Sequence, residues 1–291
     1  MDGLLLIDKP IGLSSFDVIR RVRKIIGERK AGHTGTLDPA ASGLLPVTLG
    51  SCTKLANYVS HEPKQYAFEI VFGEETDSCD DQGAVVATGP VEVDEAALRA
   101  VMAQFVGPIA QVPPRYSAVH VNGKRAYELA RAGVEFELDP RDVMIYGLEL
   151  HGLHDGVARA EVTCGSGTYV RSLARDIAHA LHTVAHARGI RRTRVGNWEV
   201  SAAVTLDALD ADARPQRFVV PALEMLGAEM PVVELDAELT QRVRNGNFVF
   251  IADDLPPSEL AALTTGGELL AVAEIERRGD ALRLQPKRVI A

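Results

Sequence analysis

Apolar residues near the start of the chain first run together and then recur at helical spacing. The run "LLLIDKP" (4–10) predicts a short strand. In "SSFDVIRRVRKIIG" (14–27), apolar residues stand at 16, 18, 19, 22, 25 and 26, the spacing of one helical face. Ser14 and Asp17 form a capping-box pattern, and Gly27 suits a C-terminal stop. We therefore expect a strand followed by an amphipathic helix.

Further along, strand-like and helix-like periods are interspersed. The segment "YAFEIVFG" (66–73) alternates as a half-buried strand does, and "VARAEVTCGSGTYV" (157–170) predicts a strand that runs into a glycine turn. "YVRSLARDIAHAL" (169–181) then has helical periodicity. Strands and helices do not follow a regular βαβ repeat, so the pattern predicts an α+β fold with a mixed sheet.

The pattern changes near residue 230. The segments "MPVVELDAELTQRVRNGNFVFI" and "GGELLAVAEIERRGDALRLQPKRVI" contain short β-like runs separated by Gly, Asn and Pro turns. A chain of 291 residues commonly forms about two domains. We expect a main domain over residues 1–230 and a small β-rich domain over residues 231–291.

Composition indicates a folded protein of a reducing compartment. Hydrophobic residues make up 46% of the chain and charged residues 24%, unlike a disordered protein. Cys52, Cys79 and Cys164 lie too far apart in sequence for a disulfide framework or a Cys-x-x-Cys metal pair. The N-terminus has an acid at position 2 and only four consecutive strongly apolar residues, too few for a signal peptide or a membrane span. We expect a cytoplasmic protein that does not contact membranes.

Charge is unevenly distributed. The formal net charge of -9 argues at first sight against a nucleic-acid partner, but the first 60 residues hold eight basic and five acidic residues. Basic residues concentrate in "RRVRK" (20–24) and "RGIRRTR" (188–194). These runs are candidates for phosphate contacts, and the alternative for each is a solvated surface.

Several motifs are missing. The chain contains no phosphate-binding loop motif, no complete dinucleotide-binding glycine motif and no His-Glu-x-x-His. The acidic residues between 74 and 81 lack the spacing of a calcium loop, so we expect them to be solvated loop charges. We therefore expect no cofactor and no metal.

One carboxylate stands out in "GHTGTLDPAASGLLPV" (32–47). Asp38 lies between a turn-forming run and an apolar run, and a carboxylate can act as a nucleophile or base only if it is kept ionised and aimed. An arginine can do both, and Arg171, just after the glycine turn, is a candidate partner. The alternative is structural, because Leu-Asp-Pro is also a common turn or helix-start signal.

The segment "GHTGTLDPAASGLLPV" resembles the signature of the TruB family of pseudouridine synthases, and further segments agree with it in order. These are "LLIDKPIGLSS" (5–15), "KQYAFEIVFGEETDSCDDQG" (64–83), "PPRYSAVHVNGKRAYELARAG" (113–133) and "CGSGTYVRSLARDI" (164–177). The resemblance spans residues 3–200. The C-terminal "LRLQPKRVI" (282–290) resembles a PUA-type RNA-binding domain more weakly.

The resemblance implies an isomerase, a tRNA pseudouridine synthase that converts the uridine of the TΨC loop, position 55 of tRNA, to pseudouridine. Such an enzyme breaks the N1–C1′ glycosidic bond, turns the base and rejoins it through C5. Asp38 is then the catalytic residue. It attacks the sugar C1′ or the base C6, or assists departure of the base, and the sequence does not choose among these.

The other site residues are carried over by position in the motifs. Tyr66, in "KQY", matches the tyrosine that stacks on the target base and is a candidate for removing the C5 proton. In "TYVR", Tyr169 matches a pocket-lining tyrosine and Arg171 the arginine that pairs with the catalytic aspartate. Ile190 matches an apolar residue that walls the base pocket. Each of these residue types is also common as ordinary core or surface.

Basic positions are carried over as substrate-binding residues. His33 matches a histidine that fills space beside the extruded nucleotide, and Lys9 and Lys64 match positions near the site or its backbone. Where the family usually has a lysine in "SAxK", this chain has His120, which puts one basic contact in doubt.

The implied partner is the T-arm of tRNA, bound by a monomer without a protein partner. A uridine in a folded loop reaches a buried carboxylate only if it is flipped out, and an aromatic ring can recover part of that cost. Two other classes stay open, an RNA-binding or RNA-folding protein with secondary catalysis and a guide-dependent relative in a multi-protein particle. A hydrolase with two carboxylates is disfavoured, since no motif places a second acid beside Asp38.

Overall fold

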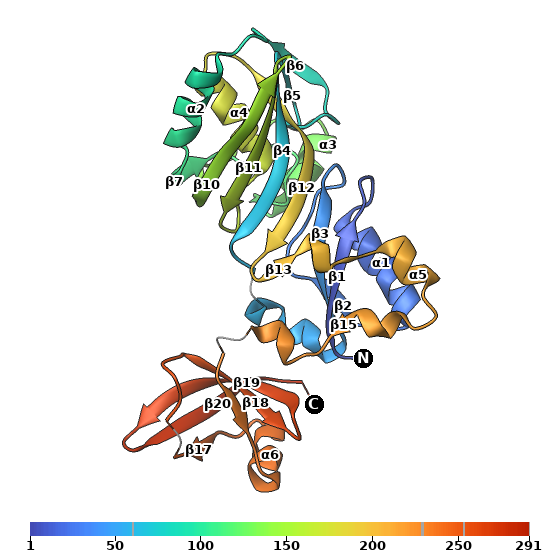
Figure 1. The fold of residues 1–291 in the computed structure, drawn as a ribbon, viewed down its shortest axis with the longest axis vertical. Helices are drawn as coiled ribbons and strands as arrows, with labels where there is room; N and C mark the ends of the chain where they lie inside the picture. Colours follow the sequence, from blue (N-terminus) through green and yellow to red (C-terminus); the bar gives the residue numbers. More distant parts are fainter. Residues whose placement is uncertain (60, 228–229, 253, 291) are drawn as a thin grey trace.

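The computed structural model describes residues 1–59, 61–227, 230–252 and 254–290. Within these residues the strands form a large mixed sheet, a smaller C-terminal sheet and two short hairpins (Figure 1). The hairpins join β5 (Glu74–Thr76) with β6 (Val85–Thr88) and β8 (His120–Val121) with β9 (Lys124–Arg125). The predicted α+β body with a β-rich C-terminal part is therefore present.

The large sheet is ordered β14-β1-β3-β12-β4-β11-β10-β7. Its strands are β14 (Val204–Thr205), β1 (Gly3–Lys9), β3 (Ser42–Leu49), β12 (Ala185–Val195), β4 (Lys64–Phe72), β11 (Val157–Cys164), β10 (Arg141–His154) and β7 (Gly107–Gln111). Three short strands extend it, β2 (Ala31–His33) on β3, β13 (Trp198–Glu199) on β12 and β15 (Val219–Val220) on β1. The pair β3–β12 is parallel, whereas β1–β3, β12–β4 and β4–β11 are antiparallel.

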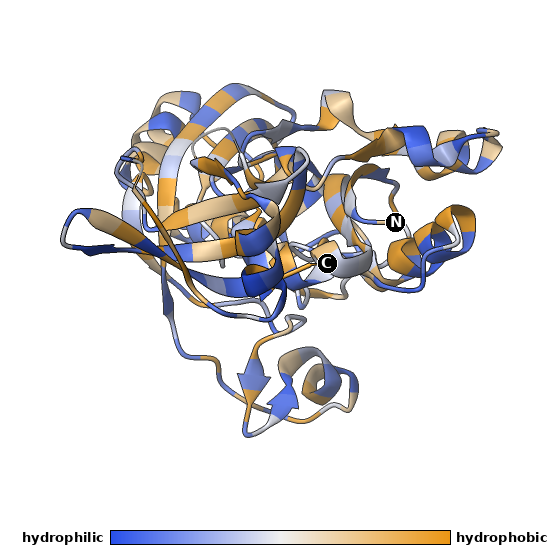
Figure 2. Cartoon of the chain, turned by 90° about the horizontal axis from the view of Figure 1, so that it is seen from below, coloured by the Kyte–Doolittle hydropathy of each residue, from blue (hydrophilic) through white to orange (hydrophobic). Residues whose placement is uncertain are grey.

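Alternating burial explains why these segments form strands. Along β4, Tyr66, Phe68, Ile70 and Phe72 are buried, and the residues between them are only partly buried. This period of two puts one face of the strand into the core. The same alternation is visible as orange and blue bands along the strands (Figure 2).

Helices cover the sheet in two groups. The helices α2 (Glu95–Gln104) and α4 (Val170–Ala180) lie together over one half of the sheet, and α1 (Ser15–Ile26) and α5 (Leu206–Ala211) lie beside β1 (Figure 1). A shorter helix, α3 (Ala126–Arg131), follows β9. Short 3-10 helices span Gly50–Tyr58, Val200–Ala202, Pro215–Phe218 and Glu224–Leu226. Among the described residues, every helix is too short or too polar to cross a membrane.

Helix α1 begins and ends where the sequence predicts. The Ser14 side chain accepts a hydrogen bond from the Asp17 backbone, Asp17 reciprocates, and Gly27 closes the helix in the left-handed region. One detail of the prediction is wrong. The spacing predicts Phe16 on the apolar face, but Phe16 is 66% exposed, because its position in the helix points away from the buried Val18 and Val22.

The C-terminal sheet is ordered β16-β18-β19-β20-β17. Its strands are β16 (Val232–Glu234), β18 (Leu260–Thr265), β19 (Glu268–Arg278), β20 (Ala281–Val289) and β17 (Val249–Ile251). The prediction of only β-like runs missed the helix α6 (Ala237–Arg244). Asp236 caps this helix through the Leu239 backbone N–H, and the short segment contributes few apolar positions to a periodic signal.

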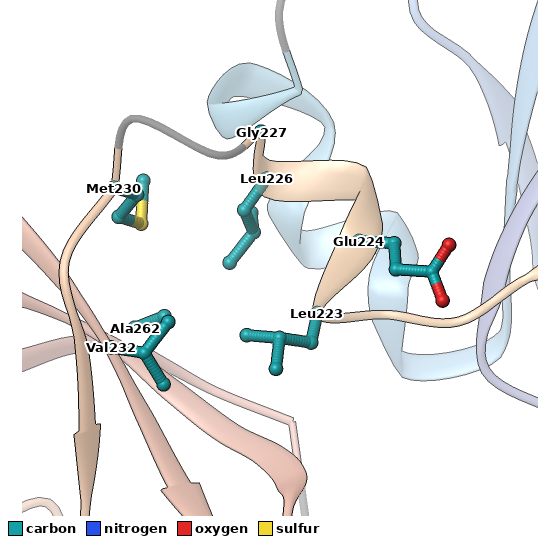
Figure 3. A pocket seen from close by; sticks show the side chains of 7 residues that line it. All are labelled: Leu223, Glu224, Leu226, Gly227, Met230, Val232 and Ala262. Atoms are coloured by element: carbon teal, nitrogen blue, oxygen red, sulfur yellow. The ribbon is translucent and has the colours of Figure 1, made fainter.

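The two sheets meet through apolar side chains. One buried cluster contains residues of both parts, among them Leu4, Leu6, Leu44, Cys52, Leu226, Ala262, Leu269, Val272 and Ile290. A hollow of about 300 Å³ lies at this junction, where Leu226 faces Met230 and Ala262 while the carboxylate of Glu224 points away (Figure 3). The C-terminal sheet is therefore packed against the main body.

Candidate active site

Asp38 lies in the connection between β2 and β3. The Ala41 backbone N–H donates to the Asp38 carbonyl at 3.1 Å, so the segment is a tight turn that leads into β3 and not the start of a helix. Ser15 fixes Leu37, the residue before Asp38. The Ser15 hydroxyl accepts a hydrogen bond from the Leu37 N–H at 2.8 Å and donates one to the Leu37 carbonyl at 3.0 Å. The Asp38 side chain is 41% exposed at this fixed turn.

Arg171 holds the Asp38 carboxylate. Its Nη2 lies 2.7 Å from Asp38 Oδ2, although the two residues are far apart in sequence. Arg171 is 4% exposed in the first turn of α4, and its guanidinium also donates to the carbonyls of Ser78 at 2.8 Å and Tyr116 at 2.9 Å. The alternative that Arg171 is an ordinary surface residue is wrong. Because several acceptors fix the guanidinium plane, it can orient the carboxylate as well as balance its charge.

A second acid shares this guanidinium. Asp80 Oδ2 lies 3.5 Å from Arg171 Nη1, and Asp80 is 6% exposed. The prediction that the acidic loop is simply solvated is wrong for this residue, and a second acid does lie near Asp38. The Thr76 hydroxyl, which donates to the Asp80 carbonyl at 2.6 Å, folds the loop inward. The sequence carried no signal for this, because the acids at 74, 75, 77, 80 and 81 have no regular spacing.

Arg192 is a buried residue that the sequence indicated only as part of a basic run. It is 1% exposed and donates to the carbonyls of Leu44 at 2.7 Å, Gly35 at 3.1 Å and Thr36 at 3.3 Å. These bonds tie β12 to both ends of the Asp38 turn. A side chain at Gly43, whose φ is +101°, would collide with the Arg192 backbone, so glycine permits this close approach. Arg192 therefore braces the turn that presents Asp38.

The rest of the second basic run is also engaged within the protein. Arg188 pairs with Glu69 at 2.8 Å, and Arg191 forms two hydrogen bonds with Asp8 at 2.7 and 3.0 Å. In the first run, by contrast, Arg21 and Lys24 are exposed on α1. The first run therefore presents exposed basic side chains to a phosphate backbone, whereas the basic side chains of the second run are already bonded within the protein.

Lys9 is fully buried beside the site. Its ammonium donates to the carbonyls of Pro10 at 2.9 Å and Leu13 at 2.7 Å. Burial lowers the pKa of Lys9 to about 8, although the charge of Asp38 opposes this change. Lys9 fixes the loop that leads to α1, so its predicted place near the site or its backbone agrees with the geometry.

Two tyrosines lie within electrostatic reach of Asp38. Tyr66, 8% exposed on β4, is the cross-strand neighbour of Arg192, and Tyr169 precedes α4, with its backbone N–H bonded to Gln111 at 2.8 Å. Burial raises the pKa of both hydroxyls, and the negative charge of Asp38 adds to the rise. Both phenols are therefore held protonated.

The remaining predicted residues differ in their surroundings. Lys64 reaches across to the Ser166 hydroxyl at 3.1 Å, and burial lowers its pKa. His33 is partly buried and lines the same cavity as Asp38, and burial lowers its pKa. Ile190 is 7% exposed and belongs to the large buried core cluster of the main body, and it is not among the residues that line the cavity described below. His120, the departure from the family pattern, is exposed on β8.

A cavity of about 660 Å³ opens over Asp38. Its lining includes Asp38, Arg171, Asp80, His33, Phe16, Tyr116, Arg125, Tyr127 and Arg131. In the described part of the chain, no group of three or more His, Cys, Asp or Glu side chains is arranged to hold a metal ion. The site therefore consists of a braced, arginine-paired carboxylate in a cavity whose lining also includes exposed arginines.

Family models and known proteins match most of the chain. A model of the TruB family pseudouridylate synthase N-terminal domain matches residues 23–170, and a model of the pseudouridine synthase II TruB C-terminal domain matches residues 231–290. The chain is 40% identical to tRNA pseudouridine synthase B of Aromatoleum aromaticum, over 100% of this chain and 93% of the relative. It is 45% identical to that of Burkholderia mallei, over 92% and 87%.

A solved structure shows the same fold. A crystal structure of a Cbf5–Nop10–Gar1 complex contains a chain that matches with a TM-score of 0.74 and 25% identity, over 99% of this chain and 85% of that one. The predicted fold class, a mixed-sheet synthase body with a small β-rich C-terminal domain, is confirmed. On the family model, the relatives and the shared fold, the chain belongs to the TruB family of pseudouridylate synthases.

Proposed function

We propose that this protein is a tRNA pseudouridine synthase that isomerises the uridine at position 55, in the TΨC loop. The observation that carries the proposal is the 2.7 Å ion pair between Arg171 and Asp38 at the wall of the cavity. It occurs in a chain whose curated relatives bear the name tRNA pseudouridine synthase B. An aspartate aimed by a buried arginine is the group that this glycosidic chemistry needs.

In this reaction the uridine N1–C1′ bond breaks, the base turns, and a C5–C1′ bond forms. The proton on C5 is removed and N1 gains one, so the product is an isomer and no redox step occurs. Asp38 attacks C1′ or C6 or assists departure of the base. In each case the carboxylate must stay in one orientation, and the Arg171 fork and the Arg192 brace supply that constraint.

We assign the surrounding side chains to substrate positioning. Tyr66 would stack on the target base. Burial raises the pKa of its hydroxyl, which keeps the phenol protonated and so disfavours it as the acceptor of the C5 proton. Tyr169 and Ile190 would bound the base pocket, and His33 would occupy space beside the extruded nucleotide. Lys9 and Lys64 would support the backbone around the turn.

The division of labour along the chain is part of the same proposal. Residues 1–230 would form the catalytic domain, and residues 231–291 would form a PUA-like RNA-binding domain. The change from the large sheet to the separate C-terminal sheet near residue 232 supports this boundary. We further propose that the protein acts on the tRNA T-arm in the cytoplasm, as a monomer without a protein partner.

The test uses purified protein, an unmodified tRNA transcript and no cofactor, with Asp38→Asn as the matched variant. Pseudouridine is mapped by carbodiimide-dependent primer extension. We expect modification only at the T-loop uridine with the wild-type chain, and none with Asp38→Asn. Tight binding without modification would instead favour an RNA-folding role or a guide-dependent relative.

A further inference from the structure

Phe16 has an unusual position for an aromatic residue. It is 66% exposed in the first turn of α1, and its ring lines the cavity that holds Asp38 and Arg171. Ile11, 63% exposed, lies on the neighbouring turn, which is joined to the Asp38 segment by the 2.8 Å bond from the Gly12 N–H to the Pro39 carbonyl. These are the two highest exposures among the large exposed hydrophobic side chains of the described residues.

Folding of α1 does not explain this exposure. The helix is anchored by Val18, Ile19, Val22 and Ile26, all of which are buried. An apolar ring left in water contributes little of the burial free energy that stabilises a fold. Departures of this kind from the local hydrophobic pattern are expected at functional sites.

The cavity has room and charge for more than one base. Its volume of about 660 Å³ is in the range of pockets that enclose whole drug-sized ligands, and a single uracil ring is smaller than these. The last residue of β9, Arg125, and the last residue of α3, Arg131, are both exposed and belong to the lining, which also contains Asp38, Asp77 and Asp80. Guanidinium groups there would attract the phosphates of an entering strand.

We propose that Phe16 is a stacking platform for a second unpaired base of the RNA substrate, the nucleotide adjacent to the target uridine. The inference rests on the proposed function, since it places RNA in the cavity. The ring offers its face to any base, so the platform tolerates sequence variation. Stacking on it recovers part of the free energy that is lost when the loop bases leave their own stack.

The test measures RNA binding and single-turnover rates for the full chain with Phe16→Ala and Phe16→Trp. The RNA is a T-arm hairpin, either intact or with each nucleotide flanking the target made abasic in turn. On intact RNA, Phe16→Ala should raise Kd by about fivefold to about 150-fold, and Phe16→Trp should restore it. The rate at saturating enzyme should not change, and on one of the abasic hairpins wild type and Phe16→Ala should bind equally.

Val106→Ala is the matched control. Val106 is an exposed apolar residue between α2 and β7, the edge strand farthest along the sheet from β3, and its removal should leave Kd unchanged. Melting temperatures should match wild type for all three variants, because the altered side chains are exposed.

Two results would overturn the platform. One is an unchanged Kd for Phe16→Ala on intact RNA. The other is the same loss of affinity on intact and on both abasic hairpins, which would show that Phe16 supports the loop and contacts no flanking base. Failure of the proposed function can be told apart from failure of the platform. In that case the wild-type chain would form no pseudouridine, while the Kd values of wild type and Phe16→Ala could still be compared.

Discussion

The interior around Asp38 in the large sheet differs in buried charge from the interior of the C-terminal sheet. Around Asp38, Lys9, Arg171 and Arg192 are buried together with Asp80. Among the described residues after 230, the buried polar side chains are those of Thr240 and Thr264, and both are uncharged. Burying charge is costly unless hydrogen bonds and partners compensate it. The difference shows that the main body accepts this cost where it presents the carboxylate, while the C-terminal sheet is stabilised by an apolar interior.

Among the tests of this comparison, we expect Arg192→Lys to have the largest effect, on the free energy of unfolding. The ammonium cannot reach the three carbonyls that the guanidinium binds, so the free energy of unfolding should fall by about 2 kcal/mol. The matched variant in the other sheet is Arg283→Lys. Arg283 is partly exposed and bonds Glu276 at 3.1 Å, so its change should stay below about 1 kcal/mol. Urea unfolding measures both, and equal losses would remove the contrast between the two interiors.

A smaller effect is expected in the pH dependence of stability. The pKa of Lys9 is about 8 in the folded chain and 10.5 ordinarily, so above pH 8 the unfolded state binds more protons. Stability should therefore rise with pH in this window, and wild type should gain about 1 kcal/mol relative to Lys9→Met between pH 8 and pH 9. Below about pH 7, where Lys9 is protonated in both states, the difference between the two proteins should be constant. Parallel curves for wild type and Lys9→Met across pH 7 to 9 would contradict the assignment.

The smallest expected effect is on the salt dependence of RNA binding, and it distinguishes the basic run at 20–24 from the one at 188–194. Arg21 and Lys24 are exposed on α1, whereas Arg188 is paired with Glu69. If the first run contacts phosphates, Arg21→Gln and Lys24→Gln should each reduce the slope of log Kd against log salt by about 1. Arg188→Gln should leave that slope unchanged. Filter binding at several salt concentrations decides this, and a loss of slope only for Arg188→Gln would reverse the roles of the two runs.

Local patterns in the sequence were enough for the elements that carry the site. The cap at Ser14 and the stop at Gly27 set the limits of α1, and alternation along residues 66–73 identified most of β4. The helix α6 was not predicted, because its eight residues lie between β-like runs and show too little helical periodicity.

The surroundings of Asp38 could not be predicted in the same way. Asp80 and Arg192 act through contacts with residues more than 90 positions away, and neither charge belongs to a spacing that marks burial. Family resemblance named Arg171 as the partner of Asp38, whereas spacing alone could only propose it as a candidate. The exposure of Phe16 contradicts its helical pattern, so it becomes visible only when the cavity is known.

The central claim is that Arg171 acts by aiming Asp38, and Arg171→Lys tests it most directly. A lysine keeps the positive charge but not the fork that bonds Asp38, Ser78 and Tyr116 together. Single-turnover formation of pseudouridine and RNA affinity are measured side by side on the same tRNA transcript. We predict a rate about 100-fold below wild type, as expected when a reacting group is displaced, with Kd nearly unchanged. A rate close to wild type would contradict the account.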